Sequence, residues 1–404
     1  MRESARLEWV VILRGVAALW VFAYHIWLSL GGLAVRFGLP FDFSFGLRSI
    51  FRAGYQGVDL FFVLSGFVIA WPFVAARETR LDRYRVADFY QRRILRIAPV
   101  YYVTLAVAVA LMSAGLLRGT VDPWSIAAHL AFAQNFVPEW VASIRGVYWT
   151  LPTEIHFYLV FPLLLRFLDV DRPLRLTLWL IAGAIGYRWL LVWLGTRHGI
   201  WLTWTAAYLP GRIDQFACGM AAACIVATAR TDAVRIRTLT VALAGLLALA
   251  CLVLVGRNAS TELDFWFVYG ASIAGAGIAL FIASLGIHAK ARPLRSAGGR
   301  AARMLHLFGD ASLSIYLWHT FFIDLALLAT WRWSLNEAAK IALVLATIPV
   351  AIGTSIVTYR TIEAPMIALS KSSPWRSRVR RFVERVSDAL SGTPSRGGKQ
   401  REID

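Results

Sequence analysis

The sequence predicts an all-α polytopic membrane protein with about ten transmembrane helices and both termini in the cytoplasm. Of its 404 residues, 58% are hydrophobic and only 16% are charged, and the mean hydropathy is +0.59. A soluble domain of average composition has about 25% charged residues and under about 50% apolar ones. The composition therefore excludes an ordinary soluble, fibrous or disordered protein.

Apolar runs of about 20 residues, the length that crosses a bilayer core of about 30 Å, recur along nearly the whole chain. Charged residues or Pro and Gly clusters bound them, and they predict ten spans, at 9–31, 55–76, 97–117, 149–168, 174–195, 206–229, 238–256, 265–287, 305–330 and 337–359. We expect one transmembrane domain over residues 1–365 and a basic cytoplasmic tail over 366–404.

The number of lysine and arginine residues alternates between high and low in successive connections between the predicted spans. The connections and termini expected on one side of the membrane hold 30 of these residues, and the connections expected on the other side hold 8. Short cytoplasmic loops carry such an excess, so this split predicts both termini inside, with the basic loops and tail against anionic lipid. The formal net charge is +18, but the basic residues do not gather on one soluble face, which argues against a nucleic-acid partner.

The three cysteines, Cys218, Cys224 and Cys251, all lie inside apolar runs. Disulfides and tetrahedral metal sites are expected in polar loops instead. We therefore expect the cysteines to be small buried hydrophobic residues, and we expect no metal cofactor.

The first predicted span contains Arg14 and His25. Eleven residues end about 20° beyond three full helical turns, so the two side chains share one face, about 16 Å apart along the axis. An ionisable group inside a span costs at least about 2.5 kcal/mol, which makes each one a functional candidate. A neutral imidazole in a partly dry pocket suits proton transfer from a hydroxyl group. An interfacial arginine and a histidine bonded between helices form the structural alternative.

Asp59 lies at the external end of the second span, within the stretch GVDLFFVLSGF. A carboxylate in the membrane needs a partner, and His25 is predicted at a compatible depth. We expect Asp59 either to orient the imidazole or to cap its own helix, and the sequence favours neither.

Arg92, Arg93 and Arg96 lie at the cytoplasmic boundary just before the third span. Their i,i+3 and i,i+4 spacings predict that the three guanidinium groups converge. Such a cluster suits phosphate through bidentate hydrogen bonds, and a stop-transfer cluster bound to lipid phosphate is an equal alternative.

The fourth, sixth and ninth spans add further polar residues. Glu154 enters the fourth span from the external side beside Trp149, and an interfacial aromatic belt explains the indole but not the carboxylate. Arg212 and Asp214 predict an intramembrane ion pair, and His319 lies about 21 Å from the cytoplasmic start of its span. These residues and those of the first two spans fall mainly in the outer half of the membrane, opposite the arginine cluster.

In this order, the motifs resemble the membrane-bound acyltransferase family 3, a family of bacterial inner-membrane O-acyltransferases. The resemblance covers nearly the whole chain and is carried by Arg14-x10-His25, GVDLFFVLSGF, Arg93-x-x-Arg96, YWTLPTEIHFYLVFP, SIYLWH and a late IEAP. Thr150 stands where the family often has serine, and Ile155–His156 where it often has Glu–Gln.

The resemblance implies transfer of an acyl group, most often acetyl, from cytoplasmic acyl-CoA to a hydroxyl of a glycan, a lipid-linked sugar or a secondary metabolite. By the resemblance, His25 is the catalytic histidine, Arg14 is its motif partner, and Arg93 and Arg96 are donor-site arginines. Glu154 matches an acidic residue of the family. The expected reaction is O-acetylation of the kind that modifies polysaccharides.

We expect the arginine cluster to hold the nucleotide end of acyl-CoA while the thioester reaches His25 in the membrane interior. Glu154 and Asp59 are candidates for orienting the imidazole, and Arg14 and Arg212 for stabilising the oxyanion. Four residues are candidates for acceptor binding or support of the site: Arg212, Trp149, Tyr316 and His319.

Two questions remain open at the level of sequence. His25 can act as a general base or as a transient acyl carrier. The rival function is a proton-coupled transporter with His25, Asp59, Glu154 and His319 as a relay, although no inverted repeat is visible.

Overall fold

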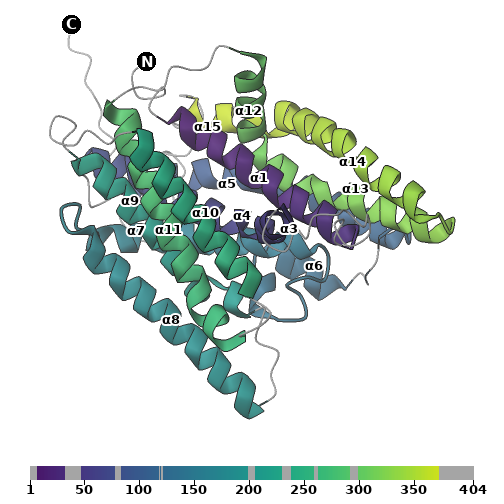
Figure 1. The fold of residues 1–404 in the computed structure, drawn as a ribbon, viewed down its shortest axis with the longest axis horizontal. Helices are drawn as coiled ribbons and strands as arrows, with labels where there is room; N and C mark the ends of the chain where they lie inside the picture. The colour runs from purple at the N-terminus through teal and green to yellow at the C-terminus, as the bar shows by residue number, and fades with distance from the viewer. Residues whose placement is uncertain are drawn as a thin grey trace, which may run out of the picture.

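A computed structural model of the chain describes residues 7–31, 47–77, 83–117, 119, 122–198, 205–229, 238–258, 263–291 and 299–372. Every regular element in these residues is helical (Figure 1), which confirms the predicted all-α class. The long helices are α1 (Glu8–Ser29), α4 (Gly57–Ala75), α5 (Arg83–Ser113), α7 (Thr150–Phe167), α8 (Pro173–His198), α9 (Ile213–Thr228), α10 (Thr238–Asn258), α11 (Leu263–Ala291), α13 (Ser312–Arg332) and α14 (Glu337–Thr358). The short α-helices are α3 (Leu47–Arg52), α6 (Pro123–Leu130), α12 (Arg300–Asp310) and α15 (Ala364–Lys371). Most of the predicted tail, from residue 373 onward, lies outside the described residues.

Each predicted span overlaps one long helix, and seven segments in the described residues are long and apolar enough to cross a membrane. These seven segments include α1, α4, α5, α8, α11, α13 and α14. The other three predicted spans correspond to α7, α9 and α10, of which α9 has only 16 residues. Length and composition therefore support a multi-pass membrane protein with seven candidate crossings.

The ninth predicted span begins too early. The predicted segment 305–330 is broken at Ala311, where α12 ends and α13 begins. Apolar residues lie on both sides of the break, but Asp310 and Ser312 flank Ala311, and Arg303 and Asp310 give α12 a polar face that does not suit a span. The break places the first turn of α13 beside α1.

The buried helix α4 is the centre of the bundle. It packs most extensively against α9 and also contacts α1, and most of its side chains are buried. In Figure 1, α8, α10 and α11 lie on one side of α1 and α4, and α12, α13 and α14 lie on the other. The elements that carry the polar residues therefore meet at the centre.

Two glycines let the α4 and α9 backbones approach closely. A Cβ atom on Gly219 would overlap the carbonyl oxygen of Val63, and one on Gly66 would overlap the carbonyl oxygen of Phe216. Close backbone contact through small residues is a common means of helix association in membranes. These glycines thus fix the position of α4 against α9.

Gly219→Ala is expected to destabilise the protein by about 1–3 kcal/mol, because the methyl group must displace the α4 backbone. The matched control is Gly186→Ala on α8, where a Cβ atom meets nothing within 4 Å. The apparent melting temperature of each variant in detergent measures the effect. Equal melting temperatures for the two variants would show that the α4 and α9 backbones leave room for a methyl group at Gly219.

Candidate active site

The histidine pair, His25 and His319, joins α1 to α13. Nδ1 of His25 lies 3.2 Å from Nε2 of His319, and the ring centroids are 4.8 Å apart. Each Nδ1 atom also lies against the carbonyl oxygen four residues back on its own helix, 2.9 Å from Val21 and 3.2 Å from Ile315. His319 is fully buried and His25 is half-buried. The structure thus brings together two histidines that the sequence placed only at similar depths.

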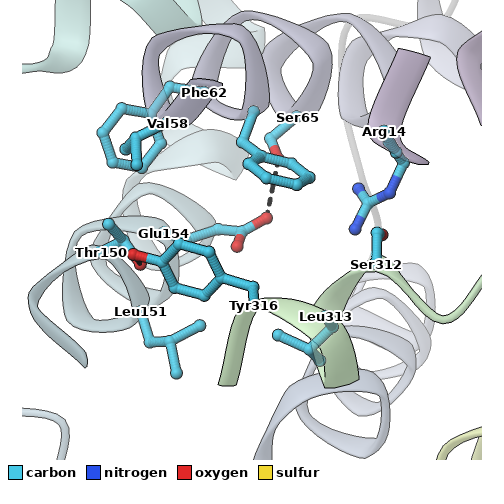
Figure 2. Close-up of a pocket in the computed structure, with 11 residues that line it drawn as sticks. Arg14, Val58, Phe62, Ser65, Thr150, Leu151, Glu154, Ser312, Leu313 and Tyr316 are labelled. Carbon is cyan, nitrogen blue, oxygen red and sulfur yellow. Dashed lines mark hydrogen bonds between the residues drawn. The ribbon is translucent and has the colours of Figure 1, made fainter. Parts of the chain in front are cut away.

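A pocket of about 400 Å³, which we call the central pocket, lies between α1, α4, α7 and α13. Figure 2 shows its polar groups facing one another across an apolar lining. The lining residues are Arg14, Val58, Phe61, Phe62, Ser65, Thr150, Leu151, Glu154, Ser312, Leu313 and Tyr316. Arg14, Glu154 and Tyr316, which the sequence singled out, therefore share one cavity.

Glu154 is the carboxylate of the central pocket. Its Oε1 atom accepts hydrogen bonds from Ser65 Oγ at 2.7 Å and from the Tyr158 hydroxyl at 2.5 Å. Arg14 enters from α1 with its guanidinium directed toward Ser312 (Figure 2), and it interacts electrostatically with Glu154. The buried Nε atom of Arg14 has no hydrogen-bond partner among the described residues. The pocket therefore retains an unused donor.

Tyr316 connects the central pocket to the histidine pair. It lines the pocket, and its ring centroid lies 5.8 Å from that of His319. Its hydroxyl donates to the carbonyl oxygen of Val147 at 2.8 Å and accepts from Thr150 Oγ1 at 3.1 Å. One ring thus separates the pocket from the two imidazoles.

The predicted convergence of Arg92, Arg93 and Arg96 is wrong for Arg92. Its Nη1 atom donates to Asp88 Oδ2 at 2.6 Å, and 37% of its side chain is exposed. The i,i+4 spacing that suggested convergence with Arg96 also offers Arg92 a carboxylate one turn earlier on the same helix.

Arg93 and Arg96 are directed toward the protein interior. The Arg93 guanidinium lies 5.8 Å from the ring centroid of Tyr158, and its buried Nε atom has no hydrogen-bond partner among the described residues. Arg96 interacts electrostatically with Arg14 and Glu363. Two of the three predicted donor-site arginines therefore lie beside the central pocket.

Asp59 lies in a separate polar cluster with Arg212 and Trp149. Its Oδ1 atom accepts from Arg212 Nη1 at 3.2 Å and from Gln215 Nε2 at 2.8 Å. The Arg212 guanidinium lies 5.4 Å from the ring centroid of Trp149. Among the described residues, the side chain that contacts the His25 imidazole at hydrogen-bond distance is His319. The Asp59 carboxylate instead binds Arg212 and Gln215 at the start of α9.

The predicted Arg212–Asp214 ion pair is wrong. Asp214 pairs instead with the buried Arg188 on α8, at 2.9 Å, and Arg212 pairs with Asp59. A helical turn places residues two apart on different sides of the axis, so Arg212 and Asp214 face different neighbours.

Several residues near the site have no role that the sequence alone predicts. Ser65 and Tyr158 bind Glu154, and Glu363 of the IEAP motif, buried at 1% exposure, accepts from Ser314 Oγ at 2.9 Å. Glu363 lies in a π-helical turn at Tyr359–Glu363, ahead of Pro365. The motifs contained these residues, but only interhelical contacts reveal their partners.

Comparison with known protein families finds one whose model covers most of the chain. A family model described as an acyltransferase domain matches residues 7–360. The chain belongs to the acyltransferase-3 family. Its family and its apolar helices point to a multi-pass membrane protein.

Three relatives illustrate the range of the family. Acyltransferase MdmB of Streptomyces mycarofaciens is 34% identical over 44% of this chain and 44% of its own length. Peptidoglycan O-acetyltransferase OatA of Listeria monocytogenes is 26% identical over 76% of this chain and 48% of its own. Exopolysaccharide production protein ExoZ of Rhizobium meliloti is 29% identical over 68% and 78%. The chain thus spans about half the length of the first relatives, and no solved structure matches it.

Proposed function

We propose that the protein transfers an acyl group from cytoplasmic acyl-CoA to a hydroxyl group of a carbohydrate acceptor, and that this acyl group is acetyl. The named activities of its relatives, peptidoglycan O-acetylation and exopolysaccharide production, support a carbohydrate acceptor. The observation that carries the proposal is the adjacency of the central pocket, flanked by Arg93 and Arg96, to the histidine pair through Tyr316.

The arrangement suits a donor with an anionic end and a reactive end. Arg93 and Arg96 offer cationic groups for the phosphates of coenzyme A. Arg14, at the same end of the pocket, is about 16 Å from His25 along α1, a separation that an extended pantetheine arm can span. The thioester would then lie at the histidine pair. Arg14 would contact a part of the donor that is remote from the reacting carbonyl.

His25 acts as general base in this proposal. The acceptor hydroxyl gives its proton to the imidazole while its oxygen forms a bond to the thioester carbonyl carbon. The carbon–sulfur bond then breaks, and the thiolate of coenzyme A takes the proton back from the imidazolium. The products are an O-acyl ester and free coenzyme A, and His25 returns to its starting state.

Reconstituted protein tests this proposal with [14C]acetyl-CoA and envelope carbohydrate extracted from the producing cells. The expected product is carbohydrate that carries label released by mild alkali, as an ester is. If wild-type protein transfers no label from acetyl-CoA or from longer acyl-CoA donors, the proposal is wrong. Collapse of an imposed pH gradient in the same proteoliposomes would then favour the transporter.

A further inference from the structure

The contacts around the histidine pair determine which nitrogen of each ring carries a proton. The carbonyl oxygens of Val21 and Ile315 can only accept hydrogen bonds, and each lies within 3.2 Å of one Nδ1 atom. Both Nδ1 atoms therefore carry a hydrogen. A neutral imidazole has one N–H, so Nε2 of each ring carries a lone pair.

The contact between the two rings has the geometry that these assignments require. Nδ1–H of His25 faces the lone pair of His319 Nε2 at 3.2 Å, so His25 donates and His319 accepts. The same Nδ1–H also donates to the Val21 carbonyl oxygen in a bifurcated arrangement. Nε2 of His25 makes no hydrogen bond to the described residues, so it is the nitrogen that can accept a proton.

We propose that His319 is the positioning residue of His25, and that its Nε2 lone pair holds the His25 Nδ1–H so that His25 Nε2 is the basic atom of the reaction. This inference rests on the proposed function and assigns the residue and the atoms through which His25 acts. When His25 takes the acceptor proton at Nε2, the positive charge spreads to Nδ1–H, and the hydrogen bond to His319 becomes charge-assisted.

His319 is held firmly enough to perform this task. It is fully buried, and the Phe22 and Tyr316 rings pack against it at centroid distances of 5.5 and 5.8 Å. Arg145 and Asp324, which form an ion pair at 2.7 Å, lie within electrostatic range of His25. Asp324 is already bound by Arg145, so His319 is the uncommitted acceptor for the imidazole.

His319→Leu and His319→Gln test the inference through kcat and KM in the labelled-transfer assay. Leucine fills a similar volume but removes the hydrogen-bond acceptor for His25 Nδ1–H. We expect kcat to fall about 100-fold with KM for acetyl-CoA unchanged. Glutamine places an amide oxygen near the Nε2 position, and we expect it to restore kcat to within about tenfold of wild type. Wild-type kcat in His319→Leu, or no recovery in His319→Gln, would overturn the inference.

The hydrogen bond can also be observed without catalysis. In 15N-histidine-labelled full-length protein in lipid bilayers, we expect protonated Nδ1 and unprotonated Nε2 on both rings, with scalar coupling between His25 Nδ1 and His319 Nε2. Single His25→Gln and His319→Gln variants assign the signals. A proton on Nε2 of His25 in the resting protein would contradict the inference, while inactivity of the wild type would bear only on the proposed function.

Discussion

Replacing His25 with alanine is expected to lower kcat for acyl transfer by about 1,000-fold. A positioned general base contributes about 100-fold to 10,000-fold, and His25 is the half-buried member of the histidine pair beside the central pocket. The loss should appear in kcat rather than in KM for acetyl-CoA, because Arg93 and Arg96, the proposed donor-binding residues, stay in place. The measurement is transfer of [14C]acetyl to carbohydrate, normalised to folded protein.

His129→Ala is the matched control for His25→Ala. His129 also lies with its Nδ1 atom against a carbonyl four residues back, that of Ser125 at 2.8 Å, but it belongs to α6 and does not line the central pocket. Folded His129→Ala protein should keep kcat within about threefold of wild type. Equal losses in the two variants would mean that His25 supports the fold instead of the chemistry.

Arg96→Ala and Arg93→Ala are each expected to raise KM for acetyl-CoA by about 10-fold to 100-fold. A hydrogen bond to a charged group is worth about 1.5–3 kcal/mol, and about 1.4 kcal/mol corresponds to a factor of ten. Both residues interact electrostatically with groups around the central pocket. Initial rates over a range of acetyl-CoA concentrations measure the change.

Arg92→Ala should change the same KM by less than about threefold, since a partly exposed ion pair contributes about 0–1 kcal/mol. Its guanidinium is already bound by Asp88 and is partly exposed. If all three arginine variants raised KM equally, the donor would bind to the exposed face of α5 rather than beside the central pocket.

The sequence predicted those features of the fold that depend on local patterns. Apolar runs located every long helix in the described residues, and the angular spacing of Arg14 and His25 placed both on one face of the first span. In the structure this face meets α13, where Arg14 faces Ser312 and His25 contacts His319. The break at Ala311 escaped prediction because apolar residues lie on both sides of the short polar stretch around it.

Partners between distant segments could not be predicted in the same way. Asp59 and Arg212 are 153 positions apart in the chain, and their pairing depends on how α4 packs against α9 through Gly66 and Gly219. Helical periodicity specifies the face on which a residue lies, but it does not specify which helix covers that face. For the same reason, the sequence offered two carboxylates as partners of His25, whereas the structure places a histidine there.

The most direct test of this account is the sidedness of transfer. Membrane vesicles are prepared in both orientations from cells that produce wild-type or His25→Ala protein, and [14C]acetyl-CoA is added outside, where it cannot cross the bilayer. The account predicts alkali-labile label on carbohydrate in inverted wild-type vesicles, and none in right-side-out vesicles or with His25→Ala. Transfer in right-side-out vesicles, or transfer that survives the loss of His25, would contradict it.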